Sequence, residues 1–463
     1  MMPFQPVMLA TDALIYLLLV LAVSFAWYTR RHDHLRAPWR RVARSHTAMG
    51  ALVIIGVYVV IGLLDTFHFR LANGEDEQGN VRYASEIHSA LDLLATPLRE
   101  RREKTYSAPF ATHLYARETI ELPDGGQVRD FPRLKWGGAH LEDPVRDRNA
   151  DILWRMLAGI AIGAGVWLAL MVLYTWRKAG DGRQWWSDPD KGPQRTAAWI
   201  GLLMLVLLGL SLTLAGAYHV LGTDKVGEDV FYQSLKSIRT GLVIGTLTTL
   251  VMLPAAILLG IMAGYFRGWV DDVIQYLYTT LSSVPGVLLI AAAVLMMQIY
   301  MSNHQDEFNS LTERADLRLL FLCVILGVTS WTSLCRLLRG ETLKLRQLEY
   351  VQAAQAFGVG HFTTLVRHIL PNVMHIVLIV VVLDFSGLVL AEAVLSYINI
   401  GVDPNTNSWG NMINSARLEL AREPLVWWSL LAAFLFMFVL VLAANLFADV
   451  VRDAFDPRLR ERS

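Results

Sequence analysis

Long apolar runs alternate with polar connections along most of the chain. A helix needs about 20 predominantly apolar residues to cross about 30 Å of hydrocarbon. Nine runs approach or exceed this length, of which the first two are the shortest; they lie at approximately 13–27, 49–64, 156–174, 198–218, 240–264, 272–300, 317–337, 369–396 and 426–448. The pattern therefore predicts an all-α polytopic membrane protein with nine crossings.

The composition agrees with a bilayer protein. Hydrophobic residues make up 54% of the 463 positions and charged residues 18%, which is too apolar for an ordinary soluble chain of this length. Lys plus Arg and Asp plus Glu both total 41, so the net charge gives no reason to expect nucleic acid as a partner. Cys323 and Cys335 would lie roughly 18 Å apart along one helix, which is too far for a disulfide.

The charges of the short connections predict the orientation. YTRRHDHLRAPWRRVARS after the first run and TWRKAGDGRQWWSDPDKGPQRT after the third run are basic, as are the connection after the seventh run and the C-terminal tail, whereas MSNHQDEFNSLTERAD after the sixth run is acidic. Nine crossings satisfy this pattern with the N-terminus outside and the C-terminus in the cytoplasm. Because Arg30 and Arg31 follow the first run, we interpret that run as a retained anchor rather than a cleaved signal peptide.

Residues 65–155 form the longest polar stretch, and this topology makes them an extracytoplasmic insert. PDGG and WGG are turn signals, and TIEL alternates like a strand. We interpret the insert as a small mixed domain or collar on the outer surface. A ligand site is the alternative.

Several kinds of chemistry have no signature in the sequence. The sequence contains no phosphate-binding loop of the form G-x-x-x-x-G-K-[ST] and no H-E-x-x-H or Cys/His metal spacing, and its 12 histidines are scattered singly. We therefore expect no cofactor and no metal. If transport uses ATP, another chain binds it.

The stretch EYVQAAQAFGVGHFTTLVRHILPN, residues 349–372, lies in a connection predicted to be cytoplasmic. A helix is predicted over 348–358; at this length it is marginal alone in water and needs a packing partner. Gly358 and Gly360 are placed to end it with a positive φ, and Pro371 is expected at the start of the next membrane helix. One side comprises Glu349, Gln352 and Gln355, of which Gln355 is expected to be solvated, and the other comprises Tyr350, Ala353, Ala354 and Phe357.

This stretch resembles the coupling motif of the permease subunits of ATP-binding-cassette importers, specifically the C-type subunit of the dipeptide and oligopeptide permeases. The family motif is E-A-A, three residues, G, nine residues and an I-x-L-P-like ending. The spacing matches throughout, with Gln352 in place of the acidic residue and His368 where the broad family has Ile. The positions that correspond to the motif are Gln352, Ala353, Ala354, Gly358, His368, Ile369, Leu370 and Pro371.

Further segments resemble the same branch in the same order, over about residues 198–460. They are LGTDKVGEDVF (221–231), GYFRGWVDD (264–272), SSVPGVLL (282–289), LAEAVLSYINIGV (390–402), NSWGNMI (407–413) and RDAFDPRLR (452–460). Glu228 departs from the arginine common in that branch, so an ion pair made there is altered. The resemblance implies a six-helix permease core at 198–460, preceded at 1–197 by an extension of about three crossings and the insert.

The resemblance also implies a function and partners. Such a permease imports di- or oligopeptides across the bacterial inner membrane and forms half of the pathway with a second, homologous permease subunit. Two cytoplasmic ATPase subunits dock beneath the pair, an extracytoplasmic binding protein delivers the substrate, and lipids surround it. The helix at 348–358 would couple the permease to the ATPases through Glu349, Tyr350, Gln352, Ala353, Ala354, Ala356, Phe357, Gly358, Arg367 and Pro371.

Two acidic residues lie in the eighth apolar run, where an unpaired charge costs at least a few kcal/mol. Glu392 matches LAEA, and a structural pairing is our favoured interpretation. Asp384 could face the pathway and meet an ammonium group of a peptide or a cation; a hydrogen bond to a hydroxyl and a neutral acid are the alternatives. Pro254 and Pro285 favour kinks in their helices and are candidate hinges.

Two other function classes stay open from the residues alone. A secondary transporter driven by an ion gradient would need titratable groups along a path, and only Asp384 clearly suggests one. A membrane receptor sensing through residues 65–155 would leave the helix at 348–358 unexplained. Among peptide-permease relatives, nickel, glycosides and antimicrobial peptides are alternative substrates to peptides.

Overall fold

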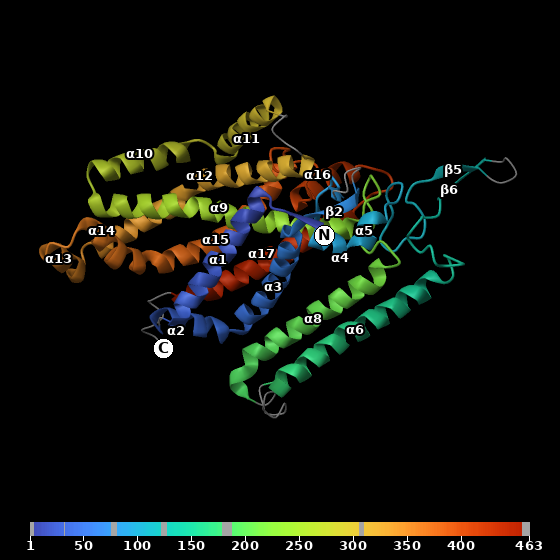
Figure 1. The fold of residues 1–463 in the computed structure, drawn as a ribbon, viewed down its shortest axis with the longest axis horizontal. Helices are drawn as coiled ribbons and strands as arrows, with labels where there is room; N and C mark the ends of the chain where they lie inside the picture. Colours follow the sequence, from blue (N-terminus) through green and yellow to red (C-terminus); the bar gives the residue numbers. More distant parts are fainter. Residues whose placement is uncertain are drawn as a thin grey trace. The chain divides into compact units, whose positions relative to one another are not determined.

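The computed structural model describes residues 4–31, 33–75, 81–121, 127–177, 188–304 and 310–455. Within these residues, nine helical segments are long and apolar enough to cross a membrane, in agreement with the predicted number (Figure 1). They are α1 (Ala10–Arg31), α3 (His46–Thr66), α6 (Arg148–Arg177), α8 (Gly192–Ala215), α9 (Val230–Phe266), α11 (Gly286–Asn303), α12 (Leu311–Leu345), the continuous run from α14 (His361–Thr364) to α15 (Leu370–Tyr397), and α17 (Trp428–Phe455). The shorter helices are α2 (Asp33–Ala43), α4 (Ala90–Leu94), α5 (Thr96–Glu100), α10 (Trp269–Ser283), α13 (Glu349–Ala356) and α16 (Trp409–Glu419).

The predicted run at 272–300 is two helices instead of one. α10 ends at Ser283, Val284 is extended with φ −88° and ψ 132°, and Pro285 caps the start of α11. Proline disfavours the helical conformation of the residue before it, which explains the break at Val284. The prediction of a kink at Pro285 was therefore wrong, whereas Pro254 does lie inside the continuous helix α9.

The eighth membrane helix begins earlier than predicted. The helical run starts at His361 and passes through a π-helical turn at Leu365–Ile369 before α15. Pro371 lies in the first turn of α15, as expected, but the helical run that contains it already starts at His361. A proline lacks the N–H for an intrahelical bond and its ring crowds the preceding turn, and a single π-helical turn is one way in which a helix accommodates such a disruption.

The chain folds as two compact units, each assembled from segments far apart in sequence. The first unit comprises Met1–Val7, Arg40–Thr240 and Asn407–Phe447, and the second comprises Met8–Trp39, Gly241–Thr406 and Ala448–Ser463. The insert therefore belongs to the first unit, and the stretch 349–372 belongs to the second.

In the first unit, α6 and α8 run side by side (Figure 1), and glycines let their backbones approach closely. A Cβ atom on Gly163 would lie 2.5 Å from the carbonyl oxygen of Leu205, closer than real Cβ atoms come. Gly159 and Gly209 meet in the same way. Small residues at such crossings are typical of helix pairs in membranes.

The insert contains small antiparallel sheets between its membrane helices. β2 pairs with β1, β3 and β4, so the N-terminal strand completes a sheet whose other strands lie in the insert. β5 and β6 form a separate hairpin, which confirms the strand predicted at TIEL, and Gly138 has a φ of +65° in the turn predicted at WGG. The predicted turn PDGG and the last five residues of RDAFDPRLR lie outside the described residues. The strands are β1 (Phe4–Val7), β2 (His68–Glu75), β3 (Val81–Tyr83), β4 (His88–Ser89), β5 (Glu118–Glu121) and β6 (Gln127–Asp130).

In the second unit, α9, α12 and α15 pack around one apolar cluster. Met252 of α9 and Leu338 of α12 are completely buried in it, together with residues of α15. The two helices approach closely, because a Cβ on Gly260 would lie 2.8 Å from the carbonyl oxygen of Cys335. Cys323 and Cys335 are both buried and free, as predicted from their spacing.

Candidate functional site

Within the stretch 349–372, the residues Glu349–Ala356 form the short helix α13, which lies next to α14 (Figure 1). Its observed bounds are close to the predicted 348–358. Gly358 has a φ of +76°, as expected, and no atom lies within 4 Å of the position that a Cβ would take there. Gly360 differs from the prediction, since its φ is −60° and it caps the start of α14.

Most of the residues expected to couple to the ATPases are exposed on α13. The side chain of Phe357 is 88% exposed and that of Tyr350 43%, whereas Val351 is completely buried and anchors the helix. A large exposed aromatic residue beside small side chains is typical of a protein contact surface. Glu349, Gln352, Ala353, Ala356 and Gly358 are also exposed, and Ala354 is half-buried.

Tyr265, near the end of α9, joins α13 to α14. Its hydroxyl lies 2.9 Å from Nδ1 of His361 and accepts a hydrogen bond of 3.3 Å from Nε2 of Gln355. Tyr265 itself is only 3% exposed. The expectation that Gln355 is simply solvated was therefore incomplete, because its side chain helps to hold α13 against α9.

The second contact of α13 leads to the start of α15. Asn372 Nδ2 donates hydrogen bonds to the Tyr350 hydroxyl at 3.1 Å and to the carbonyl oxygen of His368 at 2.6 Å. Arg367 and Pro371 are exposed in the same region. Tyr350 thus connects α13 to the residues on either side of Pro371, and α13 has contacts with both α9 and α15.

A two-point ion pair fixes α10 to α12 in the same unit. Asp271 accepts from Nε of Arg339 at 2.6 Å and from Nη2 at 2.7 Å. The hydrogen bonds from Arg339 hold the pKa of Asp271 below its usual range, although burial opposes this. Such bidentate pairs have a defined geometry, so α10 is held firmly beside α12.

The predicted pathway residues lie apart from one another. Asp384 is half-buried on α15, and it has no hydrogen bond or ion pair with the residues that the structure describes. Glu392 is 1% exposed and accepts a hydrogen bond of 2.7 Å from Oγ of Ser396. Eight residues of helix separate the two acids by about 12 Å, and Pro285 lies between α10 and α11. The structure therefore does not bring these residues together.

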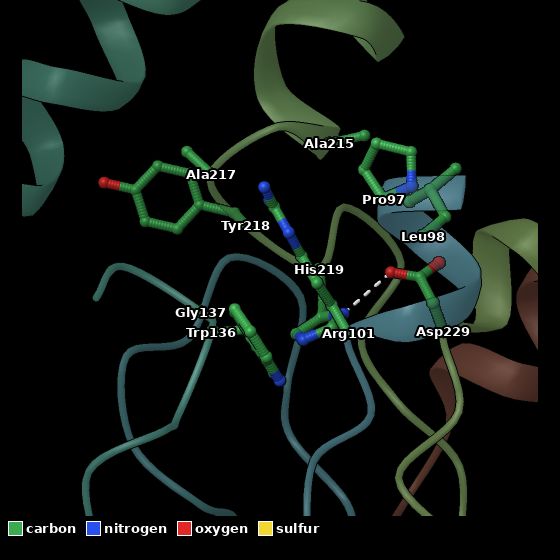
Figure 2. Close-up of a pocket in the computed structure, with 10 residues that line it drawn as sticks. All are labelled: Pro97, Leu98, Arg101, Trp136, Gly137, Ala215, Ala217, Tyr218, His219 and Asp229. Atoms are coloured by element: carbon green, nitrogen blue, oxygen red, sulfur yellow. Dashed lines mark hydrogen bonds and ion pairs between the residues drawn. The ribbon is translucent and has the colours of Figure 1, made fainter. Parts of the chain in front are cut away.

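In the first unit, a buried histidine joins the insert to the loop before α9 (Figure 2). Nδ1 of His219 lies 2.7 Å from Asp229, and Nε2 lies 3.5 Å from Glu103 of the insert. All three residues are less than 9% exposed. Burial disfavours the imidazolium, but the hydrogen bond to Asp229 and the neighbouring Glu103 carboxylate outweigh it and raise the pKa of His219 to about 9. We call these three residues the insert anchor.

Glu103 also organises the insert itself. Its carboxylate accepts hydrogen bonds from the backbone N–H groups of Lys135, Trp136 and Gly137 at 2.9, 2.8 and 3.1 Å. Burial raises the pKa of Glu103, but His219 and these three donors together lower it below its usual value. An anionic Glu103 is therefore built into the fold of the insert.

Other contacts bind the insert to the loop at 217–229. Arg102 and Glu228 form an ion pair of 2.6 Å, so the residue that departs from the expected arginine is matched by a basic residue of the insert. The backbone N–H of Ser107 donates to the Thr223 hydroxyl at 2.7 Å. Gly227 has a φ of +76°, and a Cβ there would overlap the backbone of Glu103. Sequence reasoning missed these contacts, because the partners are more than 100 residues apart.

Within the described residues, no group of three or more His, Cys, Asp or Glu side chains is placed to hold a metal ion.

The family described as "Binding-protein-dependent transport system inner membrane component" matches residues 256–461. Over 244 residues the chain is 34% identical to the glutathione transport system permease protein of Pectobacterium atrosepticum. The aligned region covers 52% of this chain and 73% of that protein. It is 31% identical over 245 residues to the oligopeptide transport system permease protein of Mycobacterium tuberculosis, with coverages of 53% and 78%. It is 28% identical over 244 residues to the dipeptide transport system permease protein of Bacillus subtilis, with coverages of 53% and 70%.

Proposed function

The chain belongs to the family of binding-protein-dependent transport system inner membrane components, and from this premise we propose that it is the permease subunit that imports di- or oligopeptides. It is a multi-pass inner-membrane protein and a transport subunit without catalytic activity of its own. A binding protein and ATPase subunits are its implied partners. In the proposal it forms half of the pathway, and a second, homologous permease subunit forms the other half.

The observation that carries the proposal is the construction of α13. Val351 and Tyr265 hold the helix on one side, while Phe357 and the alanines remain exposed. A helix held at α9 and α15 can transmit a displacement to membrane helices as a rigid body. We assign α13, with Arg367 and Pro371 beside it, as the contact with the ATPases.

The proposed topology places the N-terminus outside and the C-terminus in the cytoplasm. It assigns residues 1–197 as an extension that carries the insert on the outer side, and 198–460 as the permease core. The basic connections support this orientation. Peptides are the proposed substrate because the relatives' printed names refer to oligopeptides and dipeptides; glutathione, named for another relative, is itself a small peptide.

The test replaces small residues of α13 with bulky ones. Gly358→Arg and Ala353→Trp have room within the chain, because Ala353 is exposed and no atom lies within 4 Å of a Cβ on Gly358. In an ATPase groove the added bulk would overpack the contact at a cost of about 1 to 3 kcal/mol. We expect normal membrane accumulation, reduced recovery of co-expressed ATPases, and loss of substrate-stimulated ATP hydrolysis.

Gly268→Arg is the control for backbone strain, which is at least as large there, because the ψ of −140° at Gly268 belongs to a region that other residues avoid. Gly268 also has a positive φ, +56°, and also has no atom within 4 Å of a Cβ, but it precedes α10 instead of following α13. This variant should keep its ATPase subunits. Normal ATPase recovery and normal stimulated hydrolysis in both bulky α13 variants would show that α13 is an ordinary surface helix.

A secondary transporter driven by an ion gradient is the second candidate, favoured by the half-buried Asp384, which has no hydrogen bond or ion pair with any residue that the structure describes. The purified chain would then accumulate substrate in proteoliposomes under an ion gradient, without ATPase subunits or nucleotide. We expect no such uptake.

A further inference from the structure

The connection between the first two membrane helices carries a dense arginine surface. Arg36, Arg40 and Arg41 project from α2, and Arg44 follows its last turn; all four are exposed. Among the residues that the structure describes, none of these four side chains has a hydrogen bond or ion pair. We call these four residues the arginine face.

The opposite side of α2 is held in place by packing. Pro38 and Val42 are buried, Val42 to 5% exposure. The ring of Trp39 lies edge-to-face against Phe455, with the ring centroids 5.5 Å apart. Because α2 cannot roll about its axis without losing these contacts, the arginine face keeps a fixed direction.

The charge arrangement is unfavourable unless an anion is present. Arg36 and Arg40 are four residues apart on the helix, and like charges at this spacing destabilise a helix. By contrast, Arg31 at the end of α1 is already engaged, with its guanidinium 3.7 Å from the centre of the Trp27 ring. The general excess of basic residues in cytoplasmic connections explains the sign of the charge, but it does not explain four arginines on one held face that have no partner among the described residues.

The place of α2 in the chain identifies the anion. One membrane helix ends at Arg31 and the next begins at His46, so the short connection between them has to lie at the membrane surface, at the level of lipid phosphates. Guanidinium groups bind phosphate through two parallel hydrogen bonds, and basic clusters beside a membrane helix attract anionic headgroups. We propose that the arginine face binds the phosphates of anionic lipid headgroups such as phosphatidylglycerol. This inference needs only the membrane location of the chain and is independent of the substrate and of the ATPase contact.

The experiment measures lipid preference on the full-length chain in neutral detergent by native mass spectrometry, with phosphatidylglycerol and phosphatidylcholine as probes. We expect a preference for phosphatidylglycerol that falls at least tenfold in the Arg40→Gln/Arg41→Gln/Arg44→Gln variant. The corresponding lysine variant keeps the charge and loses the paired hydrogen bonds, so it should show an intermediate preference. The matched control removes exposed arginines of the insert, Arg117, Arg129 and Arg146, and should match the unmodified chain.

Two results would overturn the inference. An unchanged phosphatidylglycerol preference in the glutamine variant would assign the arginine face to another partner. The same conclusion would hold if that variant kept its lipid preference but lost its ATPase subunits. Complete displacement of the lipid by soluble glycerol phosphate would indicate a site for a free anion. If the glutamine variant does not accumulate, the lysine variant still decides, because a preference equal to that of the unmodified chain would exclude paired phosphate recognition.

Discussion

The insert anchor should make the attachment of the insert depend on pH. The pKa of His219 rises from its ordinary value of 6.5 to about 9, and each pH unit corresponds to about 1.4 kcal/mol. The charged histidine therefore stabilises the attached state by about 3 kcal/mol. Solvent screens this interaction little, because His219 is only 4% exposed. A raised pKa means that this stabilisation is complete below pH 6.5 and is lost as the pH rises through about 9.

The assay is hydrogen exchange at the amides of Lys135, Trp136 and Gly137, which are bonded to Glu103. Protection factors are measured from about pH 6 to about pH 10 and corrected for the intrinsic exchange rate at each pH. In the unmodified chain we expect protection to be constant below about pH 6.5, to fall as the pH rises from there to about 9, and to level off above that. His219→Gln should have lower protection at neutral pH and little further change as the pH rises.

Arg102→Gln serves as the control, because Arg102 pairs with Glu228 in the same region but is 61% exposed. Exposed ion pairs contribute about 0 to 1 kcal/mol, so this variant should follow the unmodified chain closely. Parallel protection curves for the unmodified chain and for His219→Gln across the whole pH range would refute the reasoning, since the imidazolium would then contribute nothing to the attachment.

Three further predictions concern the membrane helices and the insert. Gly163→Leu should overpack the α6–α8 crossing by about 1 to 3 kcal/mol and lower the thermal stability in detergent, whereas Gly165→Leu, which has no atom within 4 Å of a Cβ, should not; equal melting curves would contradict this. Asp384→Asn should alter transport with normal accumulation and basal ATP hydrolysis if the acid faces the pathway, and unchanged transport would remove that role. A cysteine at Val145, which is 85% exposed, should react with an impermeant thiol reagent in intact cells, where both native cysteines are buried; labelling only after lysis would reverse the proposed topology.

Hydropathy predicted the membrane helices because each crossing is one continuous apolar segment of the sequence, about 20 residues long. Hydropathy could not separate α10 from α11, since both sides of Pro285 are apolar and only the backbone restriction at Val284 ends the first helix. The start of α14 was missed for a related reason. The residues from His361 are too polar to join an apolar run, yet they continue the helix through the π-helical turn.

The helix α13 was predictable because its signals are local. Gly358 was expected to end the helix in a left-handed backbone conformation, and its φ in the structure is +76°. Its supports were not predictable, because Tyr265 is 90 residues from Gln355 and 96 from His361. His219 likewise appeared in the sequence as a single histidine, and its role depends on Glu103, more than 100 residues away. Partners at such separations are brought together by packing, for which one sequence has no local pattern.

α9 connects these two groups of contacts through one continuous backbone. The helix has 37 residues, which is about 55 Å at 1.5 Å per residue. Asp229 of the insert anchor immediately precedes it, and Tyr265, which holds α13, lies in its last turn. Pro254 lies between the two ends, and a proline there removes one helical hydrogen bond and favours bending. A displacement of α13 that reaches α9 through Tyr265 is therefore expected to bend the helix at Pro254.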